Sequence, residues 1–219
     1  MAVKALKREF PRVTDGTNSY YGGDQAWSDK KYVRGYGCGV AACANVLLHT
    51  VERKGPETTK VDYIRFARHL RHFYLPVIPK FGMNGLFMSL GLNLYFLCKR
   101  MPFYSLWGCR FKNIDKITGE MLEKDIPVVI AAGPNWPNLW GKHAVNLYTL
   151  TDGKYTVSTG ARAHYMTVTA MDDEYYTVSS WGRKYYINKN EFREYVKKHS
   201  NALFSSILVI RERHRNVHF

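Results

Sequence analysis

The stretch Tyr36-Gly37-Cys38-Gly39-Val40-Ala41-Ala42-Cys43-Ala44-Asn45-Val46-Leu47-Leu48-His49 places a cysteine between two glycines, ahead of a run of small and apolar residues. The run predicts a helix that begins at Cys38, ends near Thr50 and packs centrally, because Val40 and Leu47 fall near one face. A thiol at a helix N-terminus lies beside unpaired backbone N–H groups and the positive end of the helix dipole, which lower its pKa. Cys38 is therefore the candidate nucleophile.

The other three cysteines fit a structural interpretation. Free cysteine commonly behaves as a small buried hydrophobe, and we expect this of Cys43, Cys98 and Cys109. Their spacing matches neither a paired metal motif nor the dense disulfide framework of a small secreted domain. We expect free thiols, no metal and no cofactor.

Length and charge limit the classes of protein to consider. The chain has 219 residues, enough for one substantial core, and a formal net charge of +14 that favours anionic partners such as nucleic acid, acidic peptides or anionic membrane surfaces. No nucleic-acid-binding motif accompanies that charge, and solvated surface is the simpler interpretation. We find neither a secretory signal nor about 18 uninterrupted apolar residues, so we expect a cytoplasmic protein without a membrane span.

The chain changes character near residue 125, from helical spacing to strand patterns. Helices are expected at 38–50, after a cap at Thr58-Thr59, from Leu86 towards Cys98, at Ile114 to Glu123, and later at Asn190 to Lys198. Strands are expected at 126–132, 143–150, 154–158, 164–171, 175–180, 185–187 and 205–210. Helices first and a mostly antiparallel sheet second make an α+β fold. We expect one domain, with a helical lobe at about 20–124, a sheet lobe at about 125–212 and a short basic tail at 213–219.

A thiol nucleophile needs a base, and two histidines compete for that role. His143 and His164 each lead a similar stretch of alternating residues that ends in Tyr-Thr-Val-Ser. His164 is favoured because the strand after it leads into Ser179-Ser180-Trp181-Gly182, whereas the copy after His143 lacks the tryptophan. His143 remains the alternative.

These motifs resemble the papain-like cysteine peptidases, and within them the bacterial group related to peptidases that process bacteriocin leader sequences. In that family a Cys-Gly step opens a central helix, a later strand begins with His, and the next strand ends in Asn or Asp, commonly before Ser-Trp-Gly. The corresponding stretches here are Gly37-Cys38-Gly39, His164-Tyr165-Met166 and Ser179-Ser180-Trp181-Gly182. The resemblance covers about residues 22–192 and implies a papain-like fold with a central nucleophile helix packed on the sheet.

The resemblance also implies roles for Ser179 and Gln25, and at both positions this sequence departs from the family pattern. The position of the family's Asn or Asp is Ser179, whose hydroxyl orients an imidazole more weakly, so reduced activity and a different third group are alternatives. The family's glutamine that helps to bind the oxyanion corresponds to Gln25, farther from Cys38 than in papain, with residues 28–36 expected to form a loop. The implied function is cleavage of a peptide or isopeptide bond in a peptide or protein substrate. A catalytically silent binding protein on the same fold, and an amidase or acyltransferase with the same Cys-His pair, are the alternatives.

Overall fold

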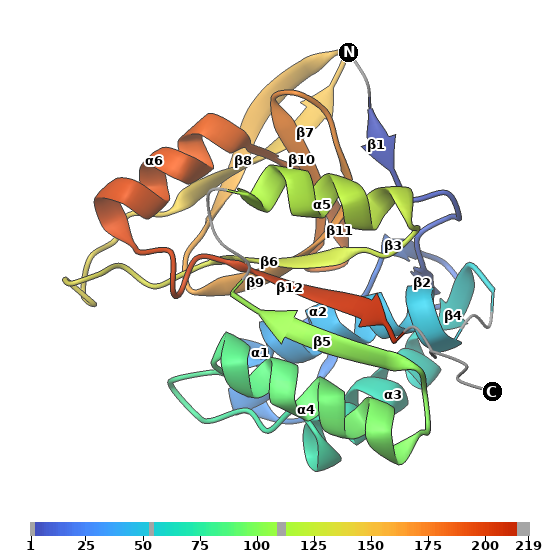
Figure 1. The fold of residues 1–219 in the computed structure, drawn as a ribbon. Helices are drawn as coiled ribbons and strands as arrows, with labels where there is room; N and C mark the ends of the chain where they lie inside the picture. Colours follow the sequence, from blue (N-terminus) through green and yellow to red (C-terminus); the bar gives the residue numbers. More distant parts are fainter. Residues whose placement is uncertain (1–2, 53–54, 109–112, 214–219) are drawn as a thin grey trace, which may run out of the picture.

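The computed structural model describes residues 3–52, 55–108 and 113–213, and its mixed α+β architecture confirms the expected fold class (Figure 1). Cys109 and residues 214–219 of the tail lie outside the described residues. The described part contains six α-helices. They are α1 (Lys31–Tyr36), α2 (Cys38–Leu47), α3 (Lys60–Phe73), α4 (Gly85–Cys98), α5 (Ile114–Glu123) and α6 (Lys189–His199). A 3-10 turn, η1 (Gln25–Trp27), precedes α1, and a π-helical turn, η2 (Leu48–Glu52), extends α2.

Within the described ranges, the main sheet has nine strands in the order β5-β12-β6-β9-β10-β11-β7-β8, with β1 beside β9, and all their pairs are antiparallel. Its strands are β1 (Lys4–Ala5), β5 (Phe103–Trp107), β6 (Val128–Ala132), β7 (Val145–Thr151), β8 (Lys154–Ala161), β9 (His164–Met171), β10 (Tyr175–Ser180), β11 (Arg183–Asn188) and β12 (Ile207–Glu212). A smaller sheet pairs β3 (Ser19–Tyr21), β2 (Arg12–Thr14) and β4 (Glu57–Thr59).

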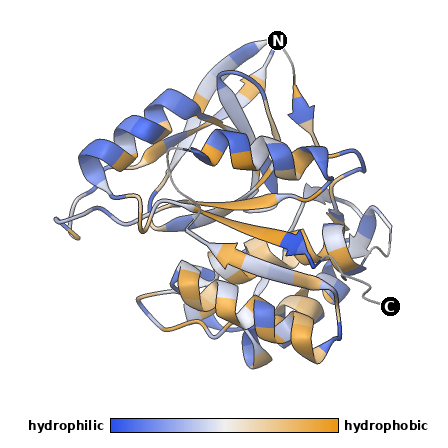
Figure 2. Ribbon diagram, in the orientation of Figure 1, coloured by the Kyte–Doolittle hydropathy of each residue, from blue (hydrophilic) through white to orange (hydrophobic). Residues whose placement is uncertain are grey.

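The central strands are buried on both faces and divide the hydrophobic core in two. Along β6, Val128 and Ile130 join one cluster with α5 and α6, whereas Val129 joins a second cluster with α2, α3 and α4. This alternation follows from the two-residue period of a strand. Helices therefore cover both faces of the sheet, with α5 and α6 on one side and α2 to α4 on the other (Figure 1). The orange inner strands of Figure 2 reflect this double burial.

Polar caps fix where the predicted helices begin. The side chain of Thr59 accepts a hydrogen bond from the backbone N–H of Asp62 at the start of α3, and that of Asn84 accepts one from Leu86 at the start of α4. Each cap satisfies an N–H group that has no partner within the helix. The predicted starts of these helices are confirmed to within one or two residues.

The observed arrangement differs from the expected lobes, about 20–124 for helices and 125–212 for the sheet, in two places, and the loop expected at 28–36 differs as well. β5 lies inside the range expected for the helical lobe, yet belongs to the main sheet, as does β1, which precedes both ranges. α5 packs on the face of the sheet opposite to α2, α3 and α4. Residues 31–36, expected in a loop, form α1. The main sheet therefore includes two short strands, β1 and β5, that the spacing of apolar residues does not predict.

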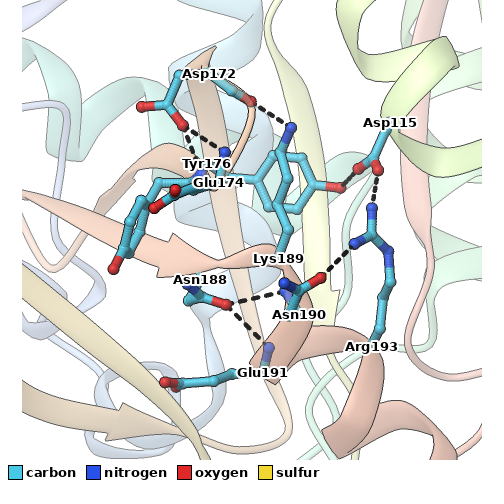
Figure 3. Close-up of polar contacts among 10 residues, drawn as sticks. Asp115, Asp172, Glu174, Tyr176, Asn188, Lys189, Asn190, Glu191 and Arg193 are labelled. Carbon is cyan, nitrogen blue, oxygen red and sulfur yellow. Dashed lines mark hydrogen bonds and ion pairs between the residues drawn. The ribbon is translucent and has the colours of Figure 1, made fainter.

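A buried lysine fastens the turn between β9 and β10 to α5 and α6 (Figure 3). The Nζ of Lys189 donates to the carbonyl of Asp172 at 2.5 Å and lies 5.1 Å from the ring centroid of Tyr176. The Tyr176 hydroxyl and the Arg193 guanidinium both donate to the carboxylate of Asp115. Burial lowers the pKa of Lys189. These contacts hold the closed end of the β9–β10 hairpin, whose open end carries the candidate site.

Candidate active site

Cys38 is the first residue of α2 and is only 8% exposed. Its thiol faces the backbone N–H groups of Tyr165 and Gly39, which favour the thiolate, but burial is the larger effect and raises its pKa. The expectation that the helix N-terminus lowers the Cys38 pKa is therefore wrong. Desolvation of the thiolate outweighs the backbone dipoles.

His164 begins β9 and is also 8% exposed. Its Nε2 forms a 2.7 Å hydrogen bond with the Oγ of Ser180, the last residue of β10, because antiparallel pairing brings the two strand ends together. The ring of Trp181 stacks on the imidazole, with centroids 4.3 Å apart and planes inclined by 20°. Burial lowers the pKa of His164 to about 4. The imidazole is thus neutral at pH 7, oriented by a hydroxyl and covered by an indole.

One pocket, with about 220 Å³ of open space, unites the residues singled out in the sequence. Cys38 and His164 both line the pocket, because α2, which carries Cys38, packs against β9, which carries His164. The remaining lining residues are Gly23, Gln25, Ala41, Ala42, Asn45, Tyr165, Ser179, Ser180 and Trp181. Every site residue expected from the sequence therefore borders the same space.

The structure corrects the role expected of Ser179. Its hydroxyl donates to the carbonyl of Tyr21 at 2.7 Å, whereas the imidazole bonds to Ser180 instead. Neighbouring residues of a strand point to opposite faces, so only one of these two serines can meet His164. Ser179 ties β10 to the N-terminal segment, and Ser180 holds the imidazole.

Gln25 reaches the pocket on the turn η1, which Asp24 caps by accepting from the Ala26 N–H. Its amide nitrogen donates to the carbonyl of Arg34 in α1 at 2.9 Å. This bond holds η1 against α1, and the chain that leaves α1 reaches Cys38, which lines the same pocket as Gln25. An amide nitrogen carries two hydrogens, so Gln25 can still donate one to a substrate oxygen.

No sequence motif singles out Asn45, which lies seven residues after Cys38 and therefore on the same side of α2. It is buried, its Oδ1 accepts the Gly23 N–H at 2.9 Å, and its Nδ2 lies 3.5 Å from the Ser179 hydroxyl. Asn45 thereby links α2 to the segment that carries Gln25 and to β10. The sequence does contain one indication of this role, since Asn45 is the only amide side chain in the otherwise apolar helix α2.

His143, the alternative base, lies elsewhere. It is exposed and stacks on His199 of α6, with ring centroids 3.7 Å apart. The cysteines also differ from expectation: Cys43 is buried as predicted, whereas Cys98 is exposed. Cys38, Cys43 and Cys98 are free thiols. The structure therefore brings His164, and not His143, to the pocket of Cys38.

Within the described ranges, no group of three or more His, Cys, Asp or Glu side chains is arranged to hold a metal ion. Across the same residues, the helices are too short or too polar for any of them to span a bilayer. Comparison with protein-family models gives no match, and a search of curated proteins gives none either.

Proposed function

We propose that the protein is a papain-like cysteine hydrolase that cleaves peptide or isopeptide bonds at Cys38. The observation that carries the proposal is the shared pocket, which is lined by Cys38 at the start of α2, by the oriented imidazole of His164 and by Gln25. A nucleophile, a base with its own orienting partner and an oxyanion donor are the parts that acyl transfer requires.

The proposed reaction begins with an uncharged pair. In the tautomer in which His164 Nε2–H donates to Ser180, Nδ1 is unprotonated and accepts the thiol proton as Cys38 Sγ attacks the substrate carbonyl. The Cys38 N–H and the Gln25 amide stabilise the resulting oxyanion. His164 then delivers the proton to the leaving amine, which departs as the thioester forms.

Hydrolysis completes the cycle. A water molecule gives its proton to His164 and attacks the thioester, and the proton returns to the sulfur when the acid product leaves. In an amidase or acyltransferase an amine would replace water in this second half. Both reactions pass through the same thioester, so the proposal for Cys38 and His164 covers them.

Two observations favour a second candidate, a catalytically silent binding protein on the same fold. Burial raises the Cys38 pKa, and the orienting group is a serine hydroxyl rather than an amide or carboxylate. A buried thiol without assistance from a base would be inert.

Electrophile labelling separates the two candidates, with the exposed Cys98 as an internal control. A mixture of peptidyl chloromethyl ketones, incubated with the protein at pH 7.5 and analysed by peptide mass spectrometry, should modify Cys38 faster than Cys98. His164→Ala should slow the Cys38 reaction about 100-fold or more, the usual contribution of a general base. Modification of Cys98 with an inert Cys38 would support the binding protein and reject the hydrolase.

A further inference from the structure

Helix α4 is apolar on the side that faces away from the core. The helix has no charged residue, and Met88, Leu92 and Phe96 bury its inner side in the second core cluster. Large apolar side chains at helical spacing also cover the outer side, where Leu97 is 68% exposed. We call this surface the α4 face; it consists of Leu86, Phe87, Leu90, Leu94 and Leu97.

Exposed apolar side chains continue beside this face. Phe81, 86% exposed, and Ile78 lie on the turn that leads into α4, and Phe73 ends α3. The end of α3 is held against α4, since the Tyr74 ring packs edge-on against Tyr95, with centroids 5.2 Å apart. Soluble proteins rarely expose so many large apolar side chains on neighbouring elements without a partner. Figure 2 shows the hydrophobic colouring along α4.

The segment of sequence that contains α4 carries charge of one sign, and the Glu52 carboxylate contacts the helix only on its inner side, through the buried Tyr95. Between Asp62 and Asp115 the sequence has no acidic residue at all. It has eight basic residues there: Arg65, Arg68, Arg71, Lys80, Lys99, Arg100, Arg110 and Lys112. Lys80 precedes α4, Lys99 and Arg100 follow it, and all three are exposed. The α4 face therefore lies between basic side chains at both ends of the helix.

We propose that the α4 face docks on an anionic membrane surface. An apolar helix face between basic residues enters the boundary between headgroups and acyl chains, while the cations contact anionic headgroups. A second copy of this chain would bring a further net charge of +14 to the contact, which opposes self-association. A duplex nucleic acid would match the charge, but its outer surface is mainly phosphate and sugar, which gives the leucines of the α4 face little apolar surface to bury against.

The turn before α4 contacts residues at the Cys38 pocket. The carbonyl of Met83, on the turn before α4, accepts a hydrogen bond from the Tyr165 hydroxyl at 3.0 Å. Met83 Cε also packs over Gly39, because an added Cβ there would lie 3.0 Å away. The proposal stands independently of catalysis, since it rests only on the apolar face and its charge.

Vesicle co-sedimentation tests the proposal directly. The full chain should sediment with vesicles of 30% phosphatidylserine in phosphatidylcholine at 0.15 M salt, and much less with phosphatidylcholine alone. The double variant Leu90→Glu/Leu94→Glu should need at least tenfold more lipid for half-maximal binding, because the apolar burial of two leucines is lost. Circular dichroism should show that it stays folded, since both leucines are exposed.

The matched control is Leu150→Glu/Val157→Glu on the β7–β8 hairpin. These residues are also exposed and apolar, and the net charge changes equally, so this variant should bind as the parent does. Phe81→Ser, outside the helix, gives a second variant that should weaken binding if the helix variant unfolds. Equal loss in the control, no preference for phosphatidylserine, or absence of binding would overturn the proposal. So would a concentration-dependent dimer that Leu90→Glu/Leu94→Glu dissociates, because the face would then be covered by a second copy.

Discussion

The thiol of Cys38 and the imidazole of His164 are nearly buried, and burial favours the uncharged form of both. It raises the Cys38 pKa and lowers the His164 pKa to about 4. A preformed thiolate–imidazolium pair is therefore disfavoured in the free protein. The proton is expected to move while the thiol attacks the substrate.

The His164 pKa makes stability depend on pH. Between pH 6.5 and 4 the unfolded chain protonates His164 and the folded chain does not, so acidification over that range favours unfolding. Relative to His164→Gln, the free energy of unfolding of the parent should fall by about 2–3 kcal/mol from pH 7.5 to pH 4.5. Urea unfolding at the two pH values measures this. If the parent instead became more stable relative to His164→Gln on acidification, the folded protein would hold a charged imidazolium, which would contradict the uncharged pair.

The two serines of β10 should respond differently to mutation. Ser180→Ala removes the hydrogen bond that orients His164, and should lower kcat about 10- to 100-fold, because bonds to a group that becomes charged contribute about 1.5–3 kcal/mol. Ser179→Ala removes the bond to the Tyr21 carbonyl and should mainly lower stability.

Steady-state kinetics and urea unfolding of both serine variants check this expectation. Restored activity in Ser180→Asn, whose amide can also accept the imidazole N–H, would support an orienting role. If Ser179→Ala lost activity and Ser180→Ala kept it, the assignment would be reversed.

The sequence identified four of the residues that line the pocket, because Cys38, His164, Ser179 and Gln25 stand in recognisable motifs. It could not assign the serine that meets His164, since that depends on which face of β10 each side chain occupies. The sign of the Cys38 pKa shift depends on burial, which the local helix pattern does not report.

At the scale of elements, a glycine sets how closely α3 and α4 approach. A Cβ on Gly91 of α4 would lie 2.0 Å from the carbonyl oxygen of Tyr74, which belongs to the backbone and cannot move freely. The contact therefore requires a residue without a side chain. Gly35 of α1 differs, since a Cβ there would have no heavy atom within 4 Å.

These two glycines give a matched pair of substitutions. Gly91→Ala should lower the free energy of unfolding by about 1–3 kcal/mol through overpacking, although alanine favours helix more than glycine. Gly35→Ala should raise it by roughly 0.5–1 kcal/mol. Thermal or urea unfolding measures both, and destabilisation of equal size in the two variants would argue against the close approach.

Elements with a clear apolar pattern could be predicted from the sequence, including the five-residue β6, whereas short strands without one could not. The bounds of α5, β9 and β10 agree with the expected ranges, because the apolar residues of each follow clear helical or strand spacing. β1 and β5 were missed because a strand of two to five residues is defined by its partners in the sheet rather than by its own pattern.

At the scale of the whole molecule, Asp125 anchors the N-terminal segment to the body. Its carboxylate accepts the backbone N–H groups of Lys7 and Arg8 and the Arg8 guanidinium, and lies 3.1 Å from His49 Nε2. Burial alone would raise the Asp125 pKa, but the contacts with Arg8 and His49 together lower it to about 2. The carboxylate thus joins segments more than 70 residues apart.

Asp125→Asn should lower the free energy of unfolding by about 2 kcal/mol at pH 7. The loss should shrink as pH falls from about 4 to 2, where the parent carboxylate is itself protonated. Asparagine tolerates the left-handed backbone at this position, where φ is 62°, so the effect reports the charge. Trypsin should cut faster after Lys7 and Arg8 in this variant, whereas Asp173→Asn, at an exposed turn, should match the parent.

Hydrolysis of a proteome-derived peptide library at pH 7.5 tests the central claim most directly, with product termini read by mass spectrometry. We expect the parent to create new termini, and Cys38→Ala and His164→Ala to lose them while remaining folded by circular dichroism. His143→Ala, which changes the exposed histidine outside the pocket, should cleave as the parent does. Termini that persist in Cys38→Ala, or a parent that creates none, would contradict the assignment of a hydrolase site to Cys38 and His164.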